Sequence, residues 1–176
     1  MNAGEEVVLL NEAGVPIGTA LKHEVHHRQT PLHLAFSCHV IDAAGRLLVT
    51  RRALAKQAWP GVWTNSFCGH PSPGEEMADA VRRRARQELS IELDDLALVL
   101  PDFRYRALDA SGIVENEICP VFRATIVGEP RPDPNEVCEY VWAEPGRIHA
   151  AAKLTPWAFS PWFVMALAQL EQRWAA

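Results

Sequence analysis

Two carboxylates stand two residues apart in the segment 113–127, at Glu115 and Glu117. In a β-strand, residues i and i+2 lie on one face, so these side chains point the same way. On a solvated outer face such a pair has no special role. On an inner face the two charges repel unless a cation lies between them. The pair is therefore a candidate cation site if this segment is a buried strand.

A cysteine and a histidine form a second close pair. His70 follows Cys68 by two residues, and six of the seven histidines precede residue 71. A lone cysteine is most often an inert buried thiol, and we interpret Cys38, Cys119 and Cys138 in that way. A thiol with an unperturbed pKa of about 8.5 is protonated at neutral pH, so Cys68 can exchange a proton where its surroundings allow.

The elements that must position these residues are short strands and two longer helices. Apolar residues three and four apart predict a helix over residues 75–90, with Ala78, Val81, Ala85 and Leu89 as its apolar stripe. Apolar runs bounded by turn residues predict strands. The predicted strands cover residues 7–11, 15–21, 32–42, 46–53, 63–69, 96–107, 113–127 and 137–143, and a last helix covers residues 161–174.

This order of elements predicts an α+β fold in which helices pack on mixed sheets. No change in composition divides the chain, so we expect residues 1–176 to form a single domain, with a core over about 7–162 and a C-terminal helix over about 161–174. The content of 48% apolar and 22% charged residues is typical of a soluble globular protein.

The net charge and the cysteines of the chain indicate which partners to exclude and which cellular compartment to expect. A net charge of −5 argues against a general nucleic-acid binder. No apolar run approaches the roughly 20 residues that cross a membrane, so we expect no membrane partner. Four cysteines without C-x-x-C spacing indicate reduced thiols, and we expect a cytoplasmic protein that is a monomer or a weak dimer.

Residues 69–91 resemble the Nudix box, which runs Gly, five residues, Glu, seven residues, then Arg-Glu-apolar-x-Glu-Glu-x-Gly-apolar. The residues in register are Gly69, Glu75, Arg83, Glu88 and Ile91, whereas Arg84 and Gln87 replace glutamates and Ser90 replaces the last glycine. In Nudix hydrolases these carboxylates hold divalent metal around a diphosphate, so their loss removes much of the metal-gathering charge. The resemblance implies Nudix-like mixed β-sheets packed with α-helices and an incomplete hydrolytic site. An ordinary amphipathic helix with a charged outer face is the alternative interpretation.

Several further motifs resemble type I isopentenyl diphosphate isomerases over about residues 7–162. They are Thr64-Asn65-Ser66-Phe67-Cys68-Gly69-His70-Pro71, Tyr105-Arg106, Glu115-Asn116-Glu117 and Trp157-Ala158-Phe159-Ser160-Pro161-Trp162. Such enzymes protonate an alkene to a tertiary carbocation and then remove a neighbouring proton. The resemblance implies interconversion of isopentenyl and dimethylallyl diphosphate, with a small-molecule isoprenoid diphosphate as ligand. The alternatives are a Nudix hydrolase of a nucleoside diphosphate derivative, against which Arg84 and Gln87 argue, and a non-catalytic binding module.

The same resemblance implies roles for individual residues. Cys68 and Glu117 are the implied acid–base pair, with Tyr105 as the hydrogen-bond partner that orients Glu117. Trp162 is implied to face the carbocation, where an indole can contribute about 2 kcal/mol. The implied contacts to the diphosphate are Lys22, Arg52, Lys56 and Arg84.

Two metal sites are also implied. The first is formed by His26, His33, His70, Glu115 and Glu117, whose donors suit Mn²⁺ or Zn²⁺ better than Ca²⁺ and also admit Mg²⁺. In the second, Glu88 holds a Mg²⁺ that bridges to the substrate diphosphate. We expect the other histidines not to bind metal and the other arginines not to bind the diphosphate. On this view His39 is a satisfied core or surface histidine, and Arg82 lies on a solvated helix face.

Overall fold

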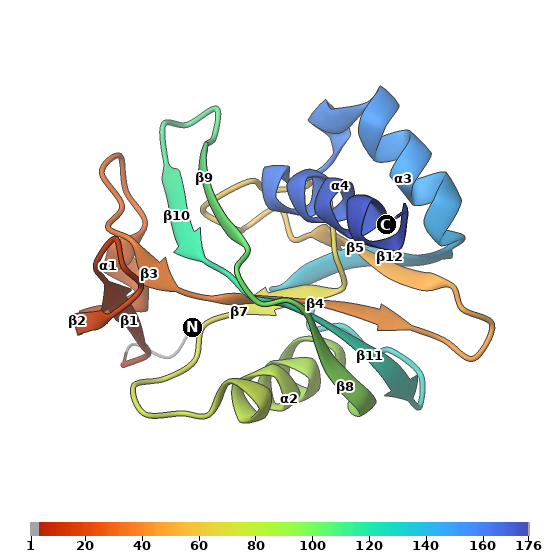
Figure 1. The fold of residues 1–176 in the computed structure, drawn as a ribbon, viewed down its shortest axis with the longest axis horizontal. Helices are drawn as coiled ribbons and strands as arrows, with labels where there is room; N and C mark the ends of the chain where they lie inside the picture. The colour runs from red at the N-terminus through yellow and green to blue at the C-terminus, as the bar shows by residue number, and fades with distance from the viewer. Residues whose placement is uncertain (1–3, 176) are drawn as a thin grey trace.

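The computed structural model of the protein describes residues 4–175, except for the side chains of residues 172–175. Its strands form two sheets (Figure 1). The first has five strands in the order β2-β1-β3-β10-β9. These strands are β1 (Glu6–Leu10), β2 (Pro16–Leu21), β3 (His33–Leu34), β9 (Arg104–Leu108) and β10 (Val114–Ile118).

The second sheet has seven strands, of which five follow the order β12-β5-β4-β11-β8. They are β4 (Phe36–Ile41), β5 (Leu47–Arg52), β8 (Glu92–Leu100), β11 (Val121–Val127) and β12 (Val137–Ala143). Two short strands complete it, β6 (Trp63–Thr64) on β5 and β7 (Phe67–Gly69) on β4.

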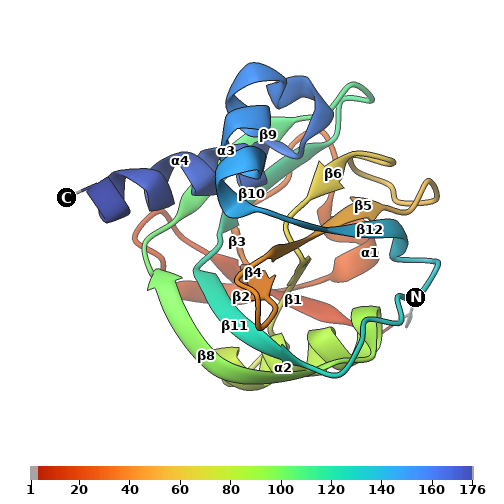
Figure 2. The ribbon, with the colours of Figure 1, turned by 90° about the vertical axis from the view of Figure 1, so that its right-hand side faces the viewer.

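Helices cover both faces of this second sheet, as Figures 1 and 2 show. The helix α2 (Met77–Leu89) packs on one face, and α3 (Pro145–Leu154) and α4 (Pro161–Ala175) lie across the other. The single turn α1 (Lys22–Val25) lies beside the first sheet, and the 3₁₀ turn η1 (Pro156–Ala158) links α3 to α4. The α+β class with mixed sheets and helices is therefore confirmed.

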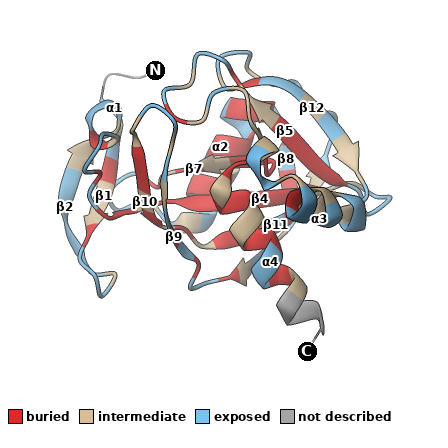
Figure 3. Ribbon diagram, turned by 90° about the horizontal axis from the view of Figure 1, so that it is seen from above, coloured by how far each residue is buried: buried red, intermediate tan, exposed pale blue. Residues whose placement is uncertain are grey.

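Two apolar cores lie between these layers. One contains Val81, Ala85 and Leu89 of α2, packed with buried residues of β4, β5 and β7. The other contains Trp162, Phe163 and further apolar residues of α4. Figure 3 shows that buried residues concentrate in the central strands β4, β5 and β7. The predicted apolar stripe was wrong at one position, because Ala78 is exposed and Ala80 is buried instead.

Three predicted strands were wrong in their extent, since each is two strands that belong to different sheets. The breaks fall at Ala35 between β3 and β4, around Phe103 between β8 and β9, and at Cys119 between β10 and β11. All three residues are buried. At Ala35 and Cys119 the chain therefore crosses between sheets without surfacing and its sequence stays apolar, whereas residues 101–102 form an exposed turn before Phe103. The predicted strand 63–69 likewise divides into β6 and β7.

The helix α3 was not predicted from the sequence. Ala152 is its only residue that is fully buried, so its sequence carries no apolar stripe of helical period. Pro145 lies at the start, where the missing N–H of proline costs no helical hydrogen bond. Among the described helices, none is long and apolar enough to cross a membrane.

Candidate active site and metal centre

The site lies where the two sheets meet, and Glu117 of β10 is its central side chain. Strand register places Glu117 directly opposite His33 in β3 and opposite Tyr105 in β9. Opposed residues of paired strands project from the same face. As a result, His33 Nε2 lies 3.4 Å from Glu117 Oε1, and the Tyr105 hydroxyl donates a hydrogen bond of 2.8 Å to Oε2.

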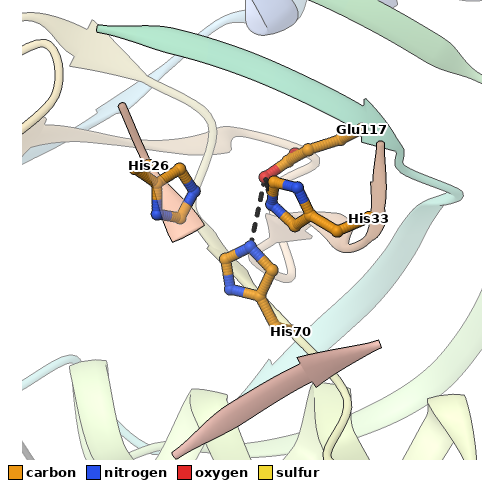
Figure 4. A group of neighbouring side chains, drawn as sticks. All are labelled: His26, His33, His70 and Glu117. Carbon is orange, nitrogen blue, oxygen red and sulfur yellow. Dashed lines mark hydrogen bonds and ion pairs between the residues drawn. The ribbon is translucent and has the colours of Figure 1, made fainter. Parts of the chain in front are cut away.

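Two further histidines reach this carboxylate cluster from other elements. His70 directly follows β7 and lies with its Nε2 3.1 Å from Glu117 Oε1 (Figure 4). His26 follows α1, and its Nε2 lies 3.0 Å from Glu115 Oε2. Ligand atoms of His26, His33, His70 and Glu117 all lie within 4.8 Å of one another. The structure thus groups four of the five expected ligands, with Glu115 beside His26.

The donor set fits a divalent ion. His26 Nε2, His33 Nε2 and Glu115 Oε2 are buried and have no hydrogen-bond partner among the described residues. Such a buried orphan atom costs about 1–3 kcal/mol, which a bound cation removes. His33 Nδ1 lies 2.9 Å from the Pro31 carbonyl oxygen, so Nδ1 carries the proton and the Nε2 lone pair faces the cluster.

Electrostatics favour the metal-binding forms of His70 and Glu117, whereas burial would lower the pKa of His33 but Glu117 raises it. Burial lowers the pKa of His70 to about 3, so its ring is neutral near pH 7. Burial would raise the pKa of Glu117, but its interactions with the His33 and His70 rings hold it well below its usual range. Burial and the charge of Glu117 raise the pKa of Glu115. An ionised carboxylate among neutral imidazoles is what metal binding requires.

Cys68 lies on β7, directly opposite Ser37 of β4. Its sulfur lies 3.4 Å from the Ser37 hydroxyl oxygen and 3.3 Å from the Asn65 amide. The same hydroxyl lies 3.4 Å from the Cys119 sulfur. Ser37 therefore lies between two thiols, of which Cys68 is one member of the expected acid–base pair. Burial raises the pKa of Cys68 to about 11.

Aromatic rings form one wall beside this pair. The Trp162 ring is buried, with its centroid 5.7 Å from that of Tyr105 and 5.4 Å from that of Trp59. The guanidinium carbon of Arg52 lies 5.3 Å from the Trp162 centroid, within cation–π range. Arg52 also donates to the carbonyl oxygens of Ala58 and Trp59. The Trp162 ring therefore has an electron-rich face that can lie against a cation.

The expected diphosphate contacts include a compact group of cations held by carboxylates. Lys22 Nζ lies 2.8 Å from Glu5 Oε2, and Lys56 Nζ lies 2.5 Å from Glu136 Oε2. Arg84 forms an ion pair with Glu88, and its Nη2 lies 3.5 Å from Glu136 Oε1.

The charged side chains of this group shift one another's pKa values. Burial and then the charge of Arg84 lower the pKa of Lys22. Burial would lower the pKa of Arg84, but the charges of Glu88 and Glu136 raise it above its usual value. Burial raises the pKa of Glu88. A polyanion would relieve the repulsion between Lys22 and Arg84.

Several residues at the site were not found from the sequence. Glu136 precedes β12 in a loop, and Glu5 lies before β1, where a single carboxylate carries no signal. In the sequence Ser37 has no distinguishing feature, and only the strand register shows that it lies opposite Cys68. His39 is a core histidine, as one of the two expectations had it, but it is not satisfied, because its Nε2 lacks a hydrogen-bond partner among the residues described. Arg82 is not free on a solvated face but donates to the Leu93 carbonyl oxygen at 2.6 Å.

Comparison with known proteins identifies the family. Residues 31–163 match the NUDIX domain. A solved structure of a Deinococcus radiodurans protein covers 94% of this chain and 99% of its own, with a TM-score of 0.73 and 21% identity. A MutT NUDIX hydrolase from Burkholderia pseudomallei covers 79% of this chain and 98% of its own, with a TM-score of 0.61 and 23% identity. These two likenesses show the fold alone.

Closer relatives share much more of the sequence. The isopentenyl-diphosphate Delta-isomerase of Clavibacter michiganensis is 62% identical over 172 residues, which are 98% of this chain and 89% of that protein. The protein of the same name from Agromyces mediolanus is 63% identical over 93% of this chain and 80% of its own. The chain therefore belongs to the NUDIX domain family and, within it, to the isopentenyl-diphosphate Delta-isomerases.

Proposed function

We propose that this protein interconverts isopentenyl diphosphate and dimethylallyl diphosphate. The observation that carries the proposal is the identity of 62% with an isopentenyl-diphosphate Delta-isomerase over nearly the whole chain. The geometry supports it, because a thiol, a carboxylate and an indole meet beside a group of cations. Arg84 and Gln87, which replace two Nudix glutamates, argue against hydrolysis as the activity.

In the proposed reaction, Cys68 and Glu117 exchange protons on opposite faces of the five-carbon chain. One adds a proton to the terminal alkene carbon, which leaves a tertiary carbocation. The other removes a proton from the methylene carbon that lies next to the cationic carbon on the diphosphate side, which forms the internal double bond. Tyr105 donates to Glu117 Oε2 and fixes the orientation of that carboxylate. The Trp162 ring faces the carbocation and stabilises it.

The proposed enzyme depends on metal. His26, His33, His70, Glu115 and Glu117 would hold a divalent ion such as Mn²⁺, Zn²⁺ or Mg²⁺, whose charge would tune the acidity of Glu117. Glu88 would hold a Mg²⁺ together with the diphosphate of the substrate. The buried nitrogen atoms of His26 and His33 that lack hydrogen-bond partners among the described residues support the first site.

Binding of the diphosphate is proposed to use Lys22, Arg52, Lys56 and Arg84. Three of these cations already form ion pairs with carboxylates, and the guanidinium of Arg52 lies against Trp162. This arrangement would place the diphosphate at the cation group and the hydrocarbon chain toward the aromatic wall. A small isoprenoid diphosphate is therefore the proposed ligand, and the cytoplasm and a monomer or weak dimer remain predictions.

The direct test is incubation of the purified protein with isopentenyl diphosphate and Mg²⁺ in D₂O. The expected result is dimethylallyl diphosphate that carries solvent deuterium, measured by NMR and mass spectrometry. Release of phosphate from a panel of nucleoside diphosphate derivatives, without isomerisation, would instead support the hydrolase alternative.

A further inference from the structure

Asn65 makes an unusually complete set of hydrogen bonds at the edge of the proposed active site. The side chain is fully buried. Its Nδ2 donates to the carbonyl oxygens of Cys38 at 3.1 Å and Phe67 at 2.6 Å. Its Oδ1 accepts from the Trp162 indole nitrogen at 3.1 Å and the Thr64 hydroxyl at 3.0 Å.

These partners fix the orientation of the amide. Backbone carbonyls can only accept, and the indole nitrogen of Trp162 can only donate. A flipped amide would oppose an acceptor to the carbonyls of Cys38 and Phe67 and a donor to Trp162, which loses three hydrogen bonds. The main-chain oxygen of Asn65 is held as well, since it accepts from the Thr50 hydroxyl at 2.9 Å. Asn65 is therefore rigid at both its backbone and its side chain.

The same rigid amide lies against the Cys68 sulfur. Both Oδ1 and Nδ2 of Asn65 are 3.3 Å from Sγ. The amide therefore offers Oδ1 as an acceptor while the S–H is intact, and Nδ2, whose two protons go to the Cys38 and Phe67 carbonyls, can reach the sulfur only by sharing one of them. One oxygen atom thus links the proposed proton-exchanging sulfur to the indole that faces the carbocation.

We propose that Asn65 is the positioning residue that fixes the Cys68 sulfur and the Trp162 indole relative to each other. This inference rests on the proposed isomerase function and deepens it. The sulfur must reach one carbon while the ring covers the cation that forms next to it. Misplacement of such groups by about 1 Å can cost on the order of 100-fold in rate. Asn65 acts through its two partners rather than on the substrate.

The role predicts a split between kcat and KM. The cations Lys22, Lys56 and Arg84 are held by Glu5, Glu136 and Glu88, independently of the amide. Loss of the amide should therefore leave KM for isopentenyl diphosphate within a few-fold while kcat falls. A merely structural asparagine would instead lower the melting temperature without changing kcat of the folded fraction.

The test compares Asn65→Ala and Asn65→Asp with the adjacent control Ser66→Ala. Ser66 is also fully buried, but its hydroxyl donates to the Leu48 carbonyl oxygen and accepts from the Val40 amide. Asn65→Asp keeps the shape and an oxygen facing Cys68 and Trp162. Burial beside two carbonyl oxygens keeps its carboxyl protonated, so that the O–H can donate to one of them and this variant still folds if Asn65→Ala is unstable. For each protein we would measure kcat, KM, metal content and melting temperature.

We expect kcat to fall by roughly 10- to 100-fold in Asn65→Ala and less in Asn65→Asp, with wild-type metal content. Ser66→Ala should lose melting temperature but keep kcat within about twofold. The inference is overturned if folded Asn65 variants retain kcat like Ser66→Ala, or if kcat follows melting temperature across all three. A wild-type protein that does not isomerise the substrate would instead overturn the proposed function.

Discussion

Glu117 is the residue on which the geometry of the site converges. His33, His70 and Tyr105 each place a polar atom within 3.4 Å of its carboxylate oxygens. Two of these contacts follow directly from strand register, so the carboxylate is positioned by backbone pairing as well as by its own rotamer. A proposed metal ligand that also moves protons has to be fixed in this way, because either task fails if the side chain turns.

Removal of one imidazole should test the metal site. We expect His70→Ala to lose most of the bound metal and to melt at a lower temperature, because ion binding to the folded state stabilises it. Elemental analysis and a thermal melt with and without added Mn²⁺ measure both effects. The matched control is His23→Ala, since His23 is exposed. Full metal occupancy in His70→Ala would contradict the proposed site.

Removal of the thiol should separate chemistry from binding. A positioned acid or base contributes about 10²–10⁴-fold, so Cys68→Ala should lose at least about 100-fold in kcat. Binding of the diphosphate should survive, because Lys22, Lys56 and Arg84 are unchanged. Turnover with deuterium incorporation is the measurement, and Cys138→Ala, which alters an exposed thiol, is the control. A Cys68→Ala protein with near wild-type turnover would move the proton transfer to another donor such as Tyr105.

At the scale of elements, the Nudix helix α2 is retained with a changed set of charged side chains. Arg84 is buried at a position where the Nudix box has glutamate, and it pairs with the remaining glutamate, Glu88. Local packing explains why the first residue of the motif, Gly69, is a glycine. A Cβ atom on Gly69 would lie 2.7 Å from Arg84 Cγ and 2.8 Å from the Phe36 ring, so only glycine lets the arginine pack beside β7.

Two arginines of this helix should respond differently to truncation. Arg84→Ala should raise KM by roughly 10- to 100-fold, the effect of one lost charged hydrogen bond of about 1.5–3 kcal/mol, with a smaller change in kcat. Arg82→Ala should leave KM within about twofold, because Arg82 bonds to the Leu93 carbonyl oxygen on β8. Steady-state kinetics and thermal melts on both variants measure this. Equal KM effects would contradict the orientation of the helix.

The sequence predicted elements better than their junctions. Helix α2 and the strands β1, β2 and β12 were expected because their apolar residues follow one period between clear turns. The crossings at Ala35 and Cys119 were missed, because a chain that passes between two buried layers keeps its apolar character. Motif resemblance brought distant residues such as His26 and Glu117 into one expected site. It did not reveal Glu136, whose role depends on a fold that brings its loop to Lys56.

At the scale of the whole molecule, the site lies between two sheets and depends on their relative placement. His33, Tyr105 and Glu117 come from the five-stranded sheet, whereas Cys68 and Arg52 come from the seven-stranded one. The chain crosses between the sheets immediately beside these residues, at Ala35 and Cys119 among others. The crossings therefore fix the two halves of the site, and loss of packing around the second sheet should affect both stability and catalysis.

The pKa of His39 reports how tightly α4 packs on the second sheet. Its ring lies on β4, 5.5 Å from the Phe163 ring of α4, and burial, with a smaller effect of a charged His149, lowers its pKa to about 4. The unfolded chain then binds a proton near pH 6.5 that the folded chain binds only near pH 4. Between these values the unfolded state carries more protons, so stability falls as pH falls, by up to about 1.4 kcal/mol per pH unit.

We expect His39→Leu to remove this contribution. Unfolding free energies of wild type and variant are measured in urea between pH 4 and pH 7, and the wild type should lose stability relative to the variant as pH falls, because only the wild type has to keep His39 neutral. The exposed His23→Ala variant should keep the wild-type slope. The difference between the two curves isolates His39 from the other buried histidines, since those titrate in both proteins. A difference that stays constant with pH would show that His39 titrates alike in the folded and unfolded protein, and hence that α4 packs less tightly on the sheet than its geometry indicates.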